Sequence, residues 1–394
     1  MGSSKITSSP VSSATVRRFD WDRDRRAADE LERSCEMGSS PSPPARISLV
    51  AIAAGDPLCR VRHFPCYEML VAEVGSVLAG IIRGTIKTVA TGTTAAGGGS
   101  PEITHARVGY ILGLRVSPLH RRQGIAMSLV RAMEEWFAEN AVEYSYMATE
   151  KRNEASVNLF TEKLGYVKFR RPEILINPVG QLPLRLSSGV TTTELTVDQA
   201  ELLYRRWMSS TEFFPLDIDR ILRSKMSLGT WVAHRRGERW PEAASWAAAS
   251  LWNCSEIFKL RVDSRTSSAP WLAKAMGRVF PCIRVPAAPA VVSSFGFFFL
   301  YGLHAEGPEA ALMVKGLCHF AHNMAMQMDG CEMIVTEIAG GGGLRRQVPH
   351  RRWLSCSGDL WCIKSLGMTE KAQVTSDWTR AAPPPAIFVD PREI

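Results

Sequence analysis

The stretch LGLRVSPLHRRQGIAMSLV, residues 112–130, decides the fold. An apolar strand ends at Val116, Pro118 interrupts it, and Gly124 leads directly into a helix. Small residues let the backbone approach a ligand closely, and the first N–H groups of a helix have no partner within it. The helix dipole favours negative charge at the same place, so this turn predicts an anion site suited to a pyrophosphate.

Positive side chains surround this turn. Arg121 and Arg122 stand shortly before Gly124, and His120 precedes them. The Gly-Lys-Ser/Thr of a Walker loop and the Gly-x-Gly pair of a Rossmann fingerprint are both missing from the turn. The turn therefore predicts a phosphate-bearing ligand held by neither of these two nucleotide-binding designs.

The turn belongs to an alternation of strands and helices. Apolar residues at helical spacing predict a helix over Gly124–Asn140. Tyr144–Thr149 predicts a strand, and Asn153–Lys163 a second helix with Gly165 just beyond its end. Upstream we expect a tail at residues 1–14, a strand at Thr15–Phe19 and a helix at Trp21–Cys35. Two paired strands at Met69–Glu73 and Val77–Ala90 follow, then a low-complexity loop at Thr91–Ser100 and a buried strand at Val108–Val116.

The second half repeats this order. Gly113-Leu114 recurs as Gly302-Leu303, and Thr149-Glu150 recurs as Thr336-Glu337, at nearly equal offsets. A strand, a helix and a strand follow in matching order, and Leu360–Lys364 is expected to close the second sheet. The chain thus divides into a disordered tail, a first α/β domain, a linker and a second domain, at residues 1–14, 15–170, 171–189 and 190–394.

Composition narrows the class of protein. The 394 residues include 47 Lys and Arg against 39 Asp and Glu, a net charge of +8, with 45% hydrophobic and 22% charged residues. These proportions are normal for a globular chain. The modest excess of positive charge favours acidic or phosphate-bearing partners, and nucleic acid is not expected as a direct ligand. Nine cysteines without zinc spacing predict reduced thiols and no metal.

Membrane insertion and secretion are not expected. The longest strongly apolar stretch, Phe295–Gly302, is shorter than the ~18 residues that a membrane span needs. The N-terminus lacks the apolar core of a signal peptide. Its Ser/Thr-rich composition fits a disordered tail, with a plastid transit peptide as the alternative.

Two motifs resemble those of the GNAT family of acyl-CoA-dependent N-acetyltransferases. The first is Arg121-x-x-Gly124-x-Ala126, and the second is Asn153-x-Ala155 followed by LFTEKLGY at residues 159–166. Strings such as YILGLRVSP, EYSYMATE, LWCIKSLG and the terminal IFVDPRE also resemble the plant HOOKLESS family of N-acetyltransferases. This resemblance implies tandem GNAT-like domains, each a mixed, splayed central sheet flanked by helices.

The resemblance also implies a function and a site. The protein would transfer acetyl from acetyl-CoA to a lysine, for instance in histones, or to an N-terminal amine, in the nucleus or cytoplasm, during hormone-controlled growth. The pantetheine arm would pair with the strand before the turn, the pyrophosphate would bind the turn, and the next helix would approach the thiol. These cofactor residues are Leu114, Arg115, Val116, Arg121, Arg122, Gln123, Gly124, Ile125, Ala126, Asn153 and Ser156.

The acid and the base depart from the family pattern. Phe160 stands where many members carry a Tyr that protonates the thiolate, and Tyr110 stands where histone-modifying members place a Glu. The candidates for the base are Glu150, Tyr110, Glu73 and, beside the turn, His120. Each has a structural alternative: a solvated strand end or helix cap for Glu150, sheet packing for Tyr110, and surface positions for Glu73 and His120.

The second half lacks the phosphate turn. Glu306 and Glu309 lie near the equivalent position and would repel phosphate. We therefore expect a degenerate domain that serves as a dock, as a surface for homo-oligomer formation or as one wall of the substrate groove. Two functions remain open, an active acetyltransferase and a CoA-binding regulatory protein that has lost its chemistry.

Overall fold

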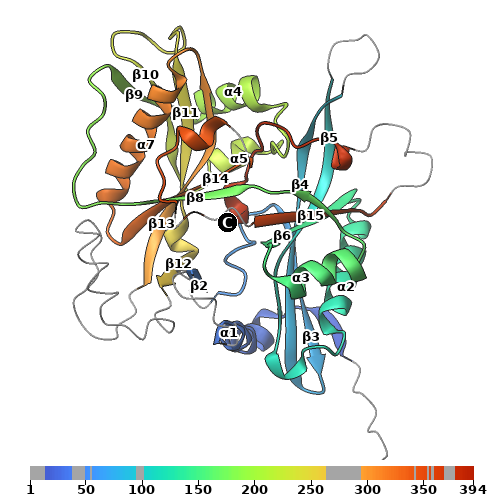
Figure 1. The fold of residues 1–394 in the computed structure, drawn as a ribbon. Coiled ribbons are helices and arrows are strands. Elements are labelled where there is room, and N and C mark those ends of the chain that lie inside the picture. The colour runs from blue at the N-terminus through green and yellow to red at the C-terminus, as the bar shows by residue number, and fades with distance from the viewer. Residues whose placement is uncertain are drawn as a thin grey trace, which may run out of the picture.

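The computed structural model describes residues 14–37, 49–53, 56–94, 102–262, 294–340, 343–352, 355, 359–367 and 378–394. Most of the expected tail, residues 95–100 of the low-complexity loop and the Pro/Ala-rich stretch 264–292 lie outside these residues. Two bodies lie side by side, and the C-terminus lies between them (Figure 1).

The first sheet has seven strands in the order β1-β3-β4-β5-β6-β15-β7. Their bounds are Thr15–Arg18, Cys66–Val74, Val77–Thr94, Glu102–Val116, Tyr144–Glu150, Asp359–Ser365 and Val167–Arg170. The second sheet has eight strands, with a path β2-β12-β13-β11-β10-β9 and with β14 joining β13 to β8. Their bounds are Leu49–Ala53, Phe258–Val262, Ser294–Glu306, Trp246–Asn253, Ser227–Arg235, Val190–Leu195, Cys331–Ile338 and Glu173–Pro178.

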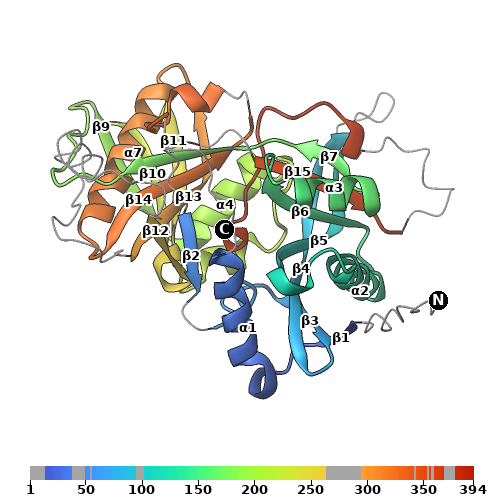
Figure 2. The same cartoon turned by 60° about the horizontal axis from the view of Figure 1, so that its bottom comes forward.

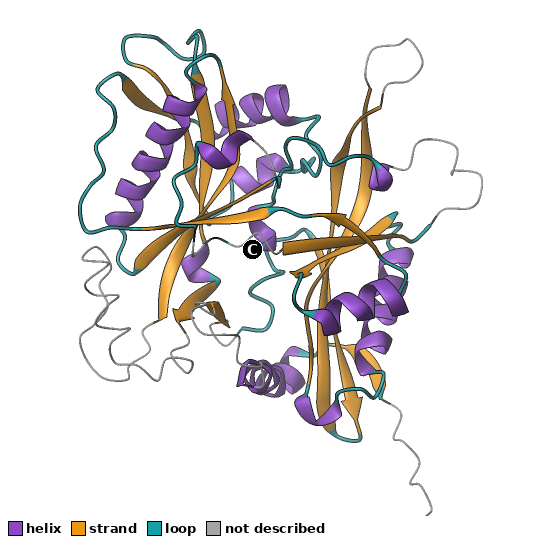
Figure 3. Cartoon of the chain, in the orientation of Figure 1, coloured by secondary structure: helices purple, strands orange, loops and turns teal. Residues whose placement is uncertain are grey.

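Helices cover these sheets, as the purple ribbons of Figure 3 show. Strand alternation decides which helix meets which face: on β3, Met69 and Val71 pack towards α1, whereas Leu70 and Ala72 pack towards α2. α7 covers one face of the second sheet and α4 the other. The helix bounds are α1 Trp21–Met37, α2 Ile125–Glu139, α3 Glu154–Asn158, α4 Val197–Met208, α5 Ile218–Leu222 and α7 Ala310–Met326.

One apolar cluster joins the two halves. It contains Tyr110 and Tyr146 of the first sheet together with Phe213, Phe299 and Phe388 of the second half. All five side chains are buried, and apolar burial stabilises a fold by roughly 25 cal/mol per Å² removed from water. The halves are therefore packed through a common core.

The two halves also exchange strands. β8 follows β7 closely in the chain but pairs with β14 in the second sheet, whereas β15 inserts between β6 and β7 in the first sheet. The prediction that Leu360–Lys364 closes the second sheet is therefore wrong, although that segment is a strand. The stretch 171–189, interpreted as a linker, contains β8 at Glu173–Pro178. Alternation of side chains shows which residues form a strand, but it does not name the partner strand.

The internal repeat extends to the backbone conformation. Gly113 on β5 has φ +62°, and Gly302 on β13 has φ +63°. Both lie beside a register shift, both strands pair in parallel with the strand that follows the next helix, and that helix is α2 in one half and α7 in the other. Two sheets, each with this central strand–helix–strand unit, confirm the expected tandem α/β architecture.

Gly113 is expected to tolerate no side chain. A Cβ there would lie 2.6 Å from Arg83 Nη1, whereas a Cβ at Gly75, which has the same φ, would meet nothing within 4 Å. Gly113→Ala should lower the free energy of unfolding by about 3 kcal/mol, of which the backbone conformation accounts for about 1 kcal/mol. Gly75→Ala should show only the backbone part in urea denaturation. Equal losses in the two variants would contradict the clash with Arg83.

Candidate functional site

Two parallel strands part at the centre of the first sheet. β5 and β6 pair from Val108 opposite Tyr144 as far as Ile111 opposite Met147. β5 then continues to Val116 beside β4, and β6 continues to Glu150 beside β15. We call the diverging segments, residues 112–116 and 148–150, the splay, and the last paired residues its apex. Backbone groups that face into the splay have no partner across it, so an extended ligand could pair with them.

A bulge shapes the β5 side of the splay. Gly113 and Leu114 together face Ile82 of β4, because the register shifts between Ile81 and Arg83. Arg83 is 2% exposed, and its guanidinium binds Glu32 Oε1 at 2.6 Å and the Pro57 carbonyl at 2.6 Å while lying beneath Gly113. A bulge redirects the backbone groups of its strand, and the buried arginine holds this one in place.

The backbone at the start of α2 has the geometry that an anion site requires. Arg122 and Gly124 both have left-handed backbones, with φ of 64° and 84°. The first backbone bond into the helix runs from the Ser128 N–H to the Gly124 carbonyl at 3.0 Å, so the N–H groups of Ile125 and Ala126 have no acceptor within the helix. A Cβ at Gly124 would meet nothing within 4 Å, which leaves open space above the turn.

The basic side chains lie close to this turn. Arg121, Arg122 and Gln123 are exposed, and Arg121 Nε donates to the Val116 carbonyl at 3.4 Å. On the strand, Arg115 Nη1 donates to the Leu114 carbonyl at 3.1 Å. Open space, free N–H groups and positive charge together fit a pyrophosphate.

Asn153 and Ser156 lie at the other wall of the splay. Asn153 is the N-cap of α3: its Oδ1 accepts from the Ser156 N–H at 3.2 Å, and its Nδ2 donates to Thr149 Oγ1 at 3.3 Å. The cap fixes the start of α3 against the end of β6. Asn153 therefore has a structural task at the site, whether or not it also contacts a ligand.

Two of the four candidate bases lie in unsuitable surroundings. Glu73 sits beside the β3–β4 hairpin, where Arg17 and Arg23 each bind its Oε1 at 2.6 Å, and the bond from Arg17 holds its carboxyl pKa below the usual range. Tyr110 is buried and stacked on Tyr146 at 4.8 Å, and burial raises its pKa far above neutrality. A strongly paired carboxylate and an un-ionised phenol are both poor proton acceptors near pH 7.

The other two candidates lie at the splay or the turn. Glu150 is exposed at the end of β6, and its carbonyl accepts from the Asn153 N–H at 2.8 Å. His120 ends a short 3₁₀ turn over Pro118–His120, and its Nδ1 is secluded from solvent without a partner among the described residues. Phe160 is buried edge-on against Tyr166, 5.0 Å away, so no acid stands at that position.

The structure adds a group of residues that the sequence interpretation did not include. The C-terminal segment lies at the centre of the molecule (Figure 2), where Asp390 and Glu393 are buried and both bind Lys87 of β4. Tyr146 donates its hydroxyl proton to Glu393, and Arg392 binds Asp217 at 2.7 Å. The terminal string IFVDPRE was one of the matching strings, so resemblance pointed to this segment but not to its position.

The equivalent site in the second half is closed. Glu309 stands immediately before α7, where its carboxylate binds Arg235 and its N–H donates to Ser245 Oγ at 3.1 Å. This ion pair places negative charge at the helix N-terminus, where a phosphate would otherwise bind. Glu309 therefore lies at the helix N-terminus where the sequence placed it, and its repulsion of phosphate stays a prediction.

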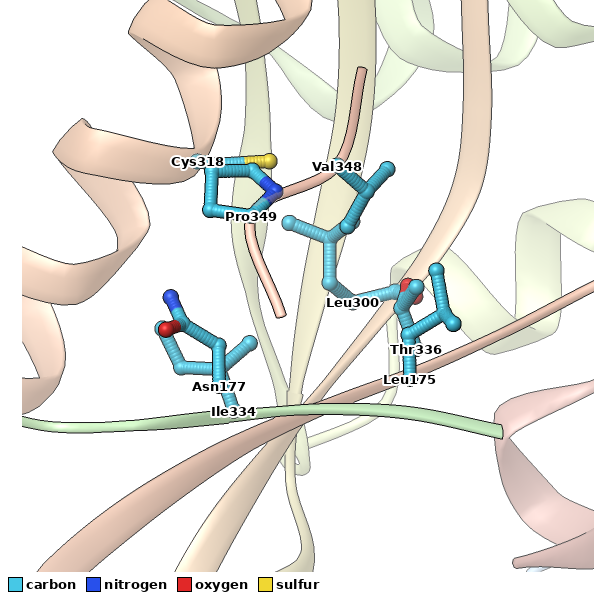
Figure 4. A pocket seen from close by; sticks show the side chains of 8 residues that line it. All are labelled: Leu175, Asn177, Leu300, Cys318, Ile334, Thr336, Val348 and Pro349. Carbon is cyan, nitrogen blue, oxygen red and sulfur yellow. The ribbon is translucent and has the colours of Figure 1, made fainter. Parts of the chain in front are cut away.

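A separate pocket of the second half is apolar and small. It lies between α7, β8, β13 and β14, and Leu175, Leu300 and Cys318 contribute to its walls (Figure 4). Burial raises the pKa of the Cys318 thiol to about 12, which keeps it protonated. Within the described part of the chain, no cluster of His, Cys, Asp and Glu could hold a metal ion, and no helix is long and apolar enough to cross a membrane.

The fold and the phosphate turn define a class of acyl-transferring proteins, and comparison with known proteins agrees. Residues 30–166 match the model of the acetyltransferase (GNAT) family. The chain is 46% identical to "Probable N-acetyltransferase HLS1-like" of Arabidopsis thaliana, over 96% of this chain and 98% of that protein. It is 36% identical to "Acetyl transferase GW6a" of Oryza sativa subsp. japonica, over 96% and 97%. The chain belongs to the GNAT acetyltransferase family.

Solved structures share the fold at low identity. Saccharomyces cerevisiae N-myristoyltransferase with bound myristoyl-CoA has a TM-score of 0.54 and 11% identity, covering 92% of this chain and 81% of that one. The glucosamine N-acetyltransferase region of a fungal multi-domain β-N-acetylglucosaminidase has a TM-score of 0.55 and 11% identity, covering 90% and 38%. At such identities the likeness concerns the fold alone.

Lys87 is expected to hold the C-terminal segment in place. Lys87→Met leaves the buried carboxyls of Asp390 and Glu393 without this ammonium, which should lower the free energy of unfolding by about 3 kcal/mol. Lys364→Met is the control, because its ion pair with Glu134 at 2.8 Å is partly exposed and should cost less than about 1 kcal/mol. Urea denaturation measures both, and similar losses would argue against this role for Lys87.

Proposed function

We propose that this protein transfers an acetyl group from acetyl-CoA to an amine of a protein substrate, either a lysine, for instance in histones, or an N-terminus. The observation that carries the proposal is the anion site at Gly124, which directly adjoins the splay between β5 and β6. A pyrophosphate bound at the turn and an extended pantetheine arm lying along the splay together match the shape of an acyl-CoA. A yeast structure of the same fold contains myristoyl-CoA, which supports an acyl-CoA as the ligand.

Each wall of the site then has a task. The N–H groups of Ile125 and Ala126, with Arg121 and Arg122, would bind the pyrophosphate. The backbone of residues 114–116 would pair with the pantetheine arm as an added strand does. Holding the thioester beside the amine makes the reaction effectively unimolecular, because the two reactants have already lost their translational and rotational entropy on binding.

Gly124→Glu should abolish this binding. The carboxylate would enter the open space above the turn and repel the pyrophosphate, so the affinity for CoA should fall on the order of 100-fold. Gly237→Glu is the matched control, because Gly237 also has a positive φ and open space but lies in the second half. Isothermal titration with CoA measures both, and tight binding by Gly124→Glu would refute the assignment of the turn.

A second candidate is a CoA-binding regulatory protein without chemistry. The buried Phe160, the un-ionised Tyr110 and the ion-paired Glu73 favour it, because none of them can serve as acid or base. It predicts CoA binding without acetylation of any protein. Mass spectrometry of a nuclear protein extract incubated with acetyl-CoA separates the two, because acetylation that is lost in Gly124→Glu supports only the enzyme.

The cellular setting is proposed from the HOOKLESS resemblance. We propose action in the nucleus during hormone-controlled growth, with the cytoplasm and the plastid as alternatives. The second half would form one wall of the acceptor groove, since both halves share one core, and it could also form a homo-oligomer. Direct binding of nucleic acid is not proposed. A steep fall in the affinity for duplex DNA with salt would support such binding; the logarithm of the binding constant would then fall with the logarithm of salt concentration with a slope of about −0.9 per phosphate contacted.

A further inference from the structure

One face of the first sheet meets the second half at the apex. Paired residues on adjacent strands share a face, and side chains alternate along each strand. The register therefore places Tyr110, Tyr146, Ala148, Trp361 and Asp359 on the same face. Three of these, Tyr110, Tyr146 and Trp361, belong to the core that joins the two halves. This face is where an acceptor amine would meet the thioester.

Glu337 approaches this face from the other sheet. It lies at the end of β14, opposite Ile174 of β8, and the repeat makes it the counterpart of Glu150. Its side chain is partly exposed, yet Oε1 is secluded from solvent and has no hydrogen-bond partner among the residues that the structure describes. Burying an acceptor without a partner is costly, and such an atom often marks a site that a ligand completes.

Glu337 lies close to β15. It continues the face of β14 that carries Met333 and Val335, and these two residues belong to the same core as Trp361. Its carboxyl also lies within the electrostatic reach of Asp359 at the start of β15. Tyr110, immediately before the apex, lies within the electrostatic reach of both acids. The strand exchange is what brings these groups together, because Asp359 reaches the first sheet only through β15.

We propose that Glu337, contributed by the second half, is the base that accepts the proton of the acceptor amine, with Asp359 as its neighbouring acid. The inference rests on the proposed function and supplies the base that Glu73 and Tyr110 cannot provide. It also gives the second half a direct part in the reaction, beyond forming a wall of the groove.

The step is balanced without a further reactant. The lone pair of the neutral amine forms the N–C bond to the thioester carbonyl carbon, and the electron pair of the C–S bond leaves with the sulfur. The carboxylate of Glu337 takes the proton of the amine, and the thiolate is then protonated by this carboxyl or by water. Amide and thiol are released, and Glu337 returns to its carboxylate form.

The electrostatics suit a base that works near neutrality. Burial raises the pKa of Glu337 well above its usual value and that of Asp359 to about 6, and the two acids titrate together. A raised pKa brings a carboxyl closer to the operating pH, where a base is most effective. Several other charged or titratable groups surround the two acids. Glu393 acts on Glu337, and Glu150 acts on Asp359. Tyr110 lies near both acids and is also near Arg60, while Glu173 on β8 is paired with Arg345.

The experiment compares Glu337→Gln with Glu332→Gln, a change of the same kind on the same strand. Acetyl-CoA turnover is measured on a pool of synthetic peptides with free lysines and N-termini, across pH 5 to 9, and CoA affinity is measured by titration. Glu337→Gln should lower kcat at least about 100-fold and abolish its rise with pH, while the Kd for CoA stays unchanged. Glu332→Gln should behave as the wild type, and Glu337→Asp should recover part of the rate.

The outcomes separate the two proposals. Absence of turnover by the wild type would end the proposed function, and this inference with it. Wild-type turnover with an unchanged rate and pH profile in Glu337→Gln would overturn the inference alone. If Glu337→Gln does not fold, Asp359→Asn provides the test: loss of the neighbouring negative charge lowers the pKa of Glu337, so the rise of kcat should move to lower pH. A rise that stays in place would also overturn the inference.

Discussion

The parting of β5 and β6 beyond Ile111 and Met147 is the constraint on which the site depends. Backbone N–H and C=O groups need partners, so two adjacent strands part only where other elements hold them. β4 holds the outer edge of β5, and β15 holds the outer edge of β6. The bulge at Gly113, fastened by Arg83, and the anion site at Gly124 both lie on the strand and turn that lead out of this opening.

The sheet that carries the turn is completed by the second half. Without β15, β6 would lose its outer neighbour and β7 would no longer be attached to the sheet. β8 makes the reciprocal contribution to β14, and the buried contacts of Lys87 with Asp390 and Glu393 bind the C-terminal segment to the first sheet. The duplication has therefore produced two interlocked halves, and the first has open space at the N-terminus of its central helix. The second has Glu309 and Arg235 in its place.

Local features were predictable because local physics sets them. The apolar stripe of α2 and the start of the next helix at Asn153 follow from helix periodicity and from rules for caps. The repeat of Gly113-Leu114 as Gly302-Leu303 pointed to an internal duplication, and the structure has equivalent bulges at the two places. The pairing of β15 with β6 was missed because alternation shows the faces of a strand and says nothing of its neighbour. The pairing of Glu73 with Arg17 and Arg23 was missed for a similar reason, since the residues come from separate elements.

The sequence by itself therefore determined the class of fold and the family motifs, and it predicted the phosphate turn, from short motifs and from their repetition along the chain. Only the tertiary structure decided what faces the apex. Glu337, Asp359 and Trp361 come from β14 and β15, and the C-terminal carboxyls from the last residues of the chain. The long-range exchange of strands brings these groups together, and burial then shifts the pKa of the Glu337–Asp359 pair upward. Burial and charge coupling depend on distances in space, which spacing along a chain does not encode.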